Sequence, residues 1–143
     1  QEATEQIFDA DGWLHTGEMA VINPEGDVYI KGRCKNMLLS ASGQNIYPEE
    51  IESRLNNLPY VNESLVIMCN EKLVALVYPD LGESLKDGLD DHALWRQIDI
   101  SRQELNKELP PYSQITKVVL QNEEFEKTAK KSIKRYLYQN MNP

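Results

Sequence analysis

The fold class is decided by residues 64–80, which read SLVIMCNEKLVALVYPD. Two apolar runs, 64–69 and 72–78, are separated only by Asn70 and Glu71. Short apolar runs split by a polar break predict two consecutive strands. The elements that flank this strand pair then determine how the domain is built.

Residues 47–58, YPEEIESRLNNL, predict a helix just before the strand pair. Pro48 suits the first helical position, and the acidic residues directly after it suit the positive N-terminal end of a helix. Ile51, Leu55 and Leu58 recur at the spacing of one buried helix face.

The other elements follow from similar signals. Residues 20–23 and 28–31 alternate in polarity around a Pro-Glu-Gly-Asp turn, which predicts a hairpin. Further along we expect a polar loop over 81–91, a helix over 92–109, a strand over 115–121, and a final helix over 131–138 with Ile133 and Leu137 facing inward. The order β-α-β-β-α-β-α from Leu38 onward predicts an α+β fold, with a small, mainly antiparallel sheet flanked by helices and preceded by the separate hairpin.

Composition narrows the function classes. The chain has 143 residues and a formal net charge of -8, which argues against a general nucleic-acid binder. Two cysteines form no disulfide framework, and two histidines provide no His-rich metal site. No apolar run approaches the ~18 residues of a membrane span, and no signal peptide is visible. We expect a cytoplasmic protein, with peripheral contact at an inner membrane left open, and the start QEATEQIFDADG suggests a fragment of a longer protein.

Three segments are more specific than an α+β domain requires. Residues 11–52 contain, in order, Thr-Gly-acid, the hairpin, Gly-Arg, a Gly-containing loop and YPEEIE; the others are LVALVYPD at 73–80 and FEKTAKKSIKRYLY at 125–138. Together they resemble the C-terminal part of the adenylate-forming superfamily, which includes acyl-CoA synthetases, luciferases and peptide-synthetase adenylation domains. The phrases GQNIYPEEIE and KKSIKRYLY are most similar to bacterial long-chain fatty acid–CoA ligases.

The resemblance implies a two-step reaction on a fatty acid, with ATP accompanied by Mg²⁺ and with CoA as co-substrate. The carboxylate attacks the α-phosphate of ATP to give an acyl-adenylate, and after a rotation of the C-terminal domain the CoA thiol displaces AMP. In such enzymes a large N-terminal domain holds most of the ATP. Residues 1–34 are therefore expected to be its distal segment, and 35–143 the mobile C-terminal domain. Without that partner domain, the chain is expected to be inactive and to bind no cofactor.

Five positions match motifs for the nucleotide, the hinge and CoA. Glu18 stands where the family usually has an Asp that accepts hydrogen bonds from both ribose hydroxyls. Arg33 matches an arginine that faces the ribose and α-phosphate, and Lys35 matches the hinge. Ser42 and Gly43 match a loop that approaches the pantetheine arm of CoA, where small residues are needed. The alternative at each position is an ordinary surface residue.

The terminal basic run departs from the family at one position. The family pattern is Pro-Lys-Thr, two free positions, Gly-Lys-Ile, one free position and Arg, and its second lysine stabilises charge during adenylation. An ungapped alignment matches Lys127, Thr128, Ile133 and Arg135 but places the critical lysine on Ser132.

A one-residue slip would bring Lys131 into the place of that lysine. We therefore rank Lys131 first and Lys134 second as the catalytic substitute. The basic run could instead be a solvated helix, or a contact for CoA phosphates or an anionic membrane surface. Two other functions stay open from the sequence: an adenylation domain that loads a carrier protein, and a non-catalytic module that binds an anionic membrane or a phosphorylated partner.

Overall fold

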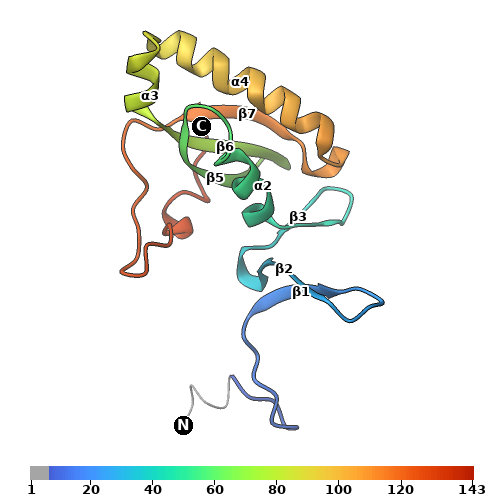
Figure 1. Ribbon diagram of the computed structural model, residues 1–143. Coiled ribbons are helices and arrows are strands. Elements are labelled where there is room, and N and C mark those ends of the chain that lie inside the picture. The colour runs from blue at the N-terminus through green and yellow to red at the C-terminus, as the bar shows by residue number, and fades with distance from the viewer. Residues whose placement is uncertain (1–6) are drawn as a thin grey trace.

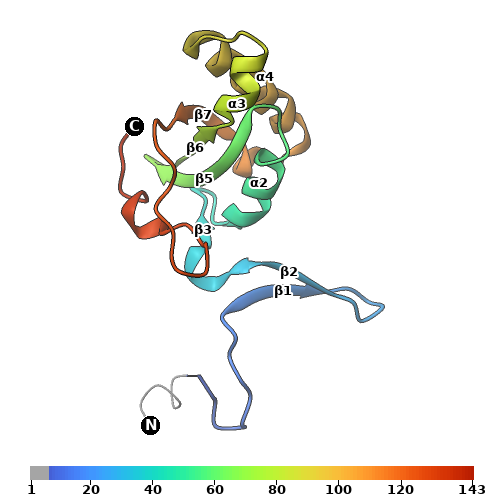
Figure 2. The same cartoon turned by 60° about the vertical axis from the view of Figure 1, so that its left-hand side comes forward.

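A computed structural model describes residues 7–143. The first unit is the antiparallel hairpin of β1 (Glu18–Ile22) and β2 (Val28–Arg33), in the region where the sequence predicts one. Figures 1 and 2 both show this hairpin lying to one side of the remaining elements, joined to them through the short 3-10 helix η1 (Cys34–Asn36).

The main unit is built on a sheet of β5 (Val61–Cys69), β6 (Lys72–Pro79) and β7 (Ile115–Leu120). The strand order is β5-β6-β7; β5 and β6 pair antiparallel, whereas β7 pairs parallel with β6. A small antiparallel pair, β3 (Leu38–Leu39) with β4 (Asn45–Ile46), precedes it. The α+β class is confirmed, with a sheet of mixed direction in the main unit.

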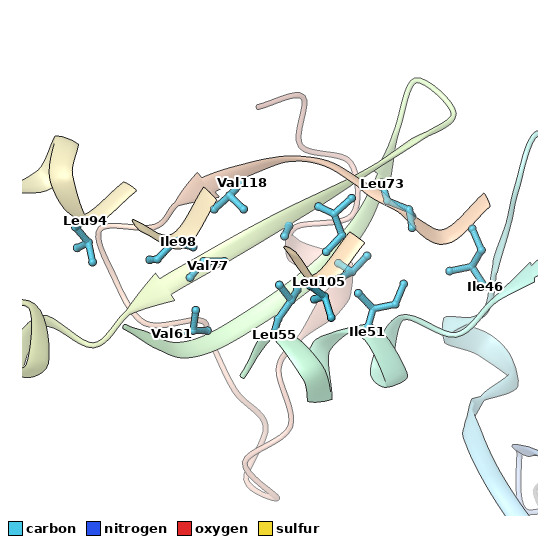
Figure 3. Packing of buried hydrophobic residues seen from close by; sticks show 13 residues of the cluster. Ile46, Ile51, Leu55, Val61, Leu73, Val77, Leu94, Ile98, Leu105 and Val118 are labelled. Carbon is cyan, nitrogen blue, oxygen red and sulfur yellow. The ribbon is translucent and has the colours of Figure 1, made fainter. Parts of the chain in front are cut away.

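Helices cover one face of this sheet. Helix α2 (Pro48–Leu55) begins at Pro48, as its sequence predicts, and α4 (Asp91–Glu108) runs alongside β7 (Figure 1). Figure 3 shows the apolar side chains from both helices meeting those of the strands. The buried members of this core are Ile46, Ile51, Leu55, Val61, Val66, Leu73, Ala75, Val77, Leu94, Ile98, Leu105, Ile115 and Val118.

The polar loop expected over 81–91 is wrong in part, because residues 81–86 form helix α3 (Leu81–Lys86). The side chain of Asp80 accepts a hydrogen bond from the backbone N–H of Glu83 at 2.9 Å, which caps the first turn. The glutamate carboxylate accepts in turn from the backbone N–H of Tyr60 at 3.2 Å. These capping bonds stabilise a short helix that has little apolar periodicity of its own.

The opposite face of the sheet is covered by the C-terminal segment. Leu65, Ile67, Val74 and Leu76 form a second buried cluster there with Phe125. The ring of Tyr138 packs edge-on against Phe125, with ring centroids 5.1 Å apart. Both faces of β5 and β6 are therefore buried along most of their length, which explains the continuous apolar runs over 65–69 and 73–78.

The final helix expected over 131–138 is wrong. Residues 127–133 instead form a tight antiparallel loop, closed by the bridge between Lys127 and Ile133, and only η3 (Arg135–Leu137) is helical. Lys131 has a left-handed backbone, φ 61°, which interrupts any helix at that point. Ile133 does pack inward, whereas Leu137 is exposed.

Among residues 7–143, none of the helices combines the length and apolar composition that crossing a bilayer requires.

Candidate functional site

The proposed nucleotide residues lie next to each other on the hairpin. Glu18 opens β1 and Arg33 closes β2, and the antiparallel register places them directly opposite one another. The guanidinium Nη2 of Arg33 is 3.4 Å from Oε1 of Glu18. A hydrogen bond involving Thr16, with the charge of Arg33 beside it, lowers the pKa of Glu18. The hairpin therefore presents one carboxylate and one guanidinium together at its base.

The predicted hinge residue, Lys35, is exposed in the middle of η1. The chain on either side of it is bound to the first turn of α2. Oε1 of Glu49 accepts a hydrogen bond from Nδ2 of Asn36 at 2.6 Å and one from the backbone N–H of Arg33 at 3.4 Å. Contacts from α2 thus reach both sides of the hinge position.

The proposed CoA loop joins β3 to β4 and is exposed at Ser42 and Gly43. Gly43 has φ 82°, and its backbone N–H donates to the carbonyl of Ser40 at 2.9 Å, which closes a tight turn. Among residues 7–143, no atom beyond its chain neighbours lies within 4 Å of the position that a Cβ would occupy on Gly43. The left-handed backbone favours glycine there, and the space beside it is open.

The terminal basic loop has a defined register. The backbone N–H of Lys131 donates to the carbonyl of Thr128 at 2.9 Å, and that of Thr128 donates to the carbonyl of Ser132 at 2.8 Å. Lys131 therefore occupies the left-handed turn position, and Ser132 lies on the returning arm of the loop, just before the bridge residue Ile133. In the ungapped alignment Lys131 coincides with the glycine of the family pattern, and a left-handed turn is where glycine is favoured.

Ion pairs divide the cations of this segment into two groups. Nζ of Lys127 lies 2.7 Å from Oε1 of Glu63, and Nζ of Lys134 lies 2.7 Å from Oε1 of Glu126. These carboxylates raise the pKa of both lysines. By contrast, the ammonium groups of Lys130 and Lys131 have no ion-pair partner within residues 7–143. The tip of the loop thus carries Lys130 and Lys131, two lysines without an ion-pair partner among the described residues.

Arg135 is held by a buried carboxylate from α2. Its Nη1 donates to Oε1 of Glu52 at 2.8 Å, and its Nη2 donates to Oε2 of the same residue. Oε1 also accepts from the backbone N–H of Val66 on β5 at 2.8 Å. Burial raises the pKa of Glu52, although Arg135 and the Val66 N–H act in the opposite direction. This pair fixes the base of the basic loop to the core.

The structure brings some of the predicted residues together and keeps others apart. Glu18 and Arg33 form one pair, whereas Ser42 and Gly43 lie on the β3–β4 loop and Lys131 lies on the terminal loop. In Figures 1 and 2 the terminal loop projects from the sheet on the side where the β1–β2 hairpin lies. No hydrogen bond or ion pair links these three places within the described residues.

The acidic residues of α2 and β5 make long-range contacts that the local signals of a helix start do not predict. Glu49, Glu52 and Glu63 each bind a partner outside their own element. Glu63 lies just before the apolar run predicted over 64–69, between Asn62 and Ser64, so no local signal marked it as part of the strand. The partners themselves are distant in the chain and are visible only in the fold.

Comparison of the chain with known proteins identifies its family. Residues 35–141 match the AMP-binding enzyme C-terminal domain. Among curated proteins, the chain is 48% identical over 66 residues to the long-chain fatty acid–CoA ligase FadD13 of Mycobacterium tuberculosis, which covers 46% of this chain and 13% of that protein. The chain therefore spans only a small part of the length of such relatives.

Two solved structures show the same fold. The adenylation domain of a carboxylate reductase from Mycobacterium chelonae aligns with a TM-score of 0.83 and 23% identity over 95% of this chain and 23% of its own. ATP-bound MatB from Rhodopseudomonas palustris aligns with a TM-score of 0.67 and 26% identity, covering 96% of this chain and 26% of its own. The resemblance read from the sequence is confirmed: the chain belongs to the AMP-binding enzyme C-terminal domain family of the adenylate-forming superfamily.

Proposed function

We propose that this chain is the C-terminal part of an ATP-dependent long-chain fatty acid–CoA ligase. The observation that carries the proposal is the family match over residues 35–141, together with the 48% identity to a long-chain fatty acid–CoA ligase. In this proposal residues 1–34 end a large N-terminal domain, and 35–143 form the mobile domain. Without the N-terminal domain, the chain makes no acyl-CoA and binds no ATP at micromolar concentration.

The first step joins the fatty acid to AMP. A carboxylate oxygen attacks the α-phosphorus of ATP, the bond to the β-phosphate oxygen breaks, and pyrophosphate leaves. Negative charge grows on the α-phosphate oxygens, so a positioned ammonium stabilises the transition state. We assign this role to Lys131, because it is adjacent to Ser132 and its ammonium has no ion-pair partner among residues 7–143. Lys134 is second, because it must first leave Glu126.

Glu18 and Arg33 are assigned to the nucleotide. The carboxylate of Glu18 accepts hydrogen bonds from the two ribose hydroxyls, and the guanidinium of Arg33 faces the ribose and α-phosphate. Their separation of 3.4 Å supports this assignment, because one nucleotide can contact both groups at once. Residues 7–143 contain no group of three His, Cys, Asp or Glu side chains suited to a metal, so we assign the Mg²⁺ that accompanies ATP no ligand among them.

The second step transfers the acyl group to CoA. After rotation at Lys35, the loop with Ser42 and Gly43 lies along the pantetheine arm, and the open space beside Gly43 leaves room for it. The CoA thiol releases its proton to solvent, its sulfur attacks the acyl carbon, the bond from that carbon to the AMP phosphate oxygen breaks, and AMP leaves.

The test uses the longer protein that contains this chain, with ATP and a series of fatty acids, assayed for pyrophosphate release. We expect release that depends on the fatty acid, followed by CoA-dependent release of AMP. AMP release with a carrier protein and not with CoA would favour a carrier-loading adenylation domain.

Comparing the wild-type protein with one variant distinguishes loss of the catalytic lysine from absence of ligase activity. The variant Ser132→Lys places an ammonium where the ungapped alignment puts the family lysine. If both the wild-type protein and this variant release no pyrophosphate, the ligase proposal fails. Salt-sensitive binding of anionic vesicles or a phosphopeptide by the same proteins would then favour the non-catalytic module.

A further inference from the structure

Two adjacent glutamates of α2 bind the chain across the hinge position. Nζ of Lys31, on β2, lies 2.8 Å from Oε1 of Glu50. Glu49 binds the backbone N–H of Arg33 before the hinge and the side chain of Asn36 after it. The hairpin before Lys35 is therefore attached to a helix that follows Lys35.

The Glu49 carboxylate is only half satisfied in this arrangement. Its Oε2 is buried and has no hydrogen-bond partner within the described residues. It also lies over Gly32, where an added Cβ would be 2.6 Å from Oε2. A buried acceptor without a donor is unfavourable, because it has lost its water and gained nothing in return. The bound orientation is thus held by some contacts and opposed by others, as expected of an element with two arrangements.

We propose that Glu49 and Glu50 are positioning residues that latch the β1–β2 hairpin to the C-terminal domain in one orientation. Rotation at Lys35 breaks the contacts to Lys31 and to the Arg33 N–H. The contact from Glu49 to Asn36 survives, because both residues lie after the hinge. Release also returns the buried Oε2 to water. The catalytic meaning of this latch rests on the proposed function, whereas its existence does not.

The latch is tested on this chain by a distance measurement that needs no activity. Spin labels are placed at Ile22 on β1 and Leu85 on α3, which are 67% and 75% exposed, after Cys34 and Cys69 are replaced by serine. Double electron–electron resonance should give one narrow distance distribution. Glu49→Gln with Glu50→Gln should broaden it or add a second population. Glu104→Gln, which removes an exposed ion pair within α4, should leave it unchanged.

A double-mutant cycle identifies the contact itself. Gly32→Ala should displace Glu49 and enlarge the second population as Glu49→Ala does. In the Glu49→Ala background the same alanine should add less, because the clash is gone and only the strain of an alanine at the φ of 159° of Gly32 remains. Any effect of the alanine on the backbone alone would persist in that background. An unchanged distribution in the double glutamine variant, or additive effects in the cycle, would overturn the latch.

In the longer protein the two half-reactions report on the latch separately. Single-turnover rates of adenylate formation and of acyl transfer to CoA should change in opposite directions in Glu50→Gln, by about threefold or more. Equal slowing of both steps would indicate a structural role and contradict positioning. Wild-type protein that forms no adenylate would defeat the proposed function while leaving the distance data to decide the latch.

Discussion

Arg135 binds both carboxylate oxygens of Glu52, a residue 83 positions earlier in the chain. The pair is mostly buried, with side-chain exposures of 21% and 10%. It joins the C-terminal segment to α2 and, through the Val66 N–H, to β5. The loop that carries the proposed catalytic lysine is therefore anchored by an ion pair at its base.

Removing the guanidinium should destabilise the fold markedly. Arg135→Met leaves the Glu52 carboxylate buried without its partner, which costs about 3 kcal/mol in comparable pairs. Urea denaturation of the chain measures the change. Arg54→Met is the matched control, because its pair with Glu108 is exposed and contributes less than about 1 kcal/mol. Equal effects of the two substitutions would show that the Glu52 pair is not an anchor.

The free energy of unfolding should depend on pH as expected for a carboxyl group, Glu52, whose pKa is raised on folding. Burial raises the pKa of Glu52 above its ordinary value of 4.5 in the folded state. Its contribution to the free energy of unfolding is then greatest below that value and is lost as pH rises through the folded pKa. The difference in stability between wild type and Glu52→Gln should therefore shift against wild type as pH increases.

Asp99 provides a control of opposite sign. The hydrogen bond from Arg102 lowers the pKa of Asp99 below its ordinary value of 3.8. Its contribution is present above that value and is lost as pH falls through the folded pKa. The difference in free energy of unfolding between wild type and Asp99→Asn should therefore shift in favour of wild type as pH increases. If Glu52→Gln behaves like Asp99→Asn, Arg135 outweighs burial at Glu52.

Lys131 should affect stability and chemistry through different parts of the residue. Lys131→Gly removes the steric penalty of the left-handed backbone and should stabilise the fold by about 1 kcal/mol. Lys131→Ala keeps that penalty and should change stability little. Lys130→Gly, at a position without positive φ, should bring no gain. Chemical denaturation of the three variants measures these differences, and equal stabilities of Lys131→Gly and Lys131→Ala would contradict a steric penalty at this turn.

The same lysine should matter for adenylation. In the longer protein, Lys131→Ala should lower fatty-acid-dependent pyrophosphate release about 10²-fold, because one preorganised charge is lost at the α-phosphate. Lys134→Ala should have a smaller effect, and Lys130→Ala, the other uncommitted tip lysine, should have the least. Equal losses at Lys130 and Lys131 would indicate general attraction of an anion and contradict a positioned catalytic group.

The sequence predicted the elements that depend on local signals. The apolar runs around Asn70 and Glu71 became β5 and β6, and Pro48 began α2. The last segment was misread because Ile133 and Leu137 have helical spacing, whereas its conformation is set by contacts elsewhere. The turn at Lys131 and the anchor from Arg135 to Glu52 determine it, and neither is visible in local periodicity.

In the candidate site, too, residue identities could be predicted from the sequence, whereas long-range contacts could not. The identities of Glu18, Arg33 and Lys35 could be matched to a family pattern one by one. Their surroundings could not, because the glutamates of α2 meet them only after folding. The same holds for the ion pair that distinguishes Lys134 from Lys131, because Glu126 binds Lys134 only in the folded chain.

The most direct test is CoA-dependent turnover by the longer protein with and without residues 35–143. The account predicts that the intact protein converts fatty acid, ATP and CoA to acyl-CoA, AMP and pyrophosphate, and that the truncated protein makes no acyl-CoA. Acyl-CoA formation at an undiminished rate after removal of residues 35–143 would contradict it.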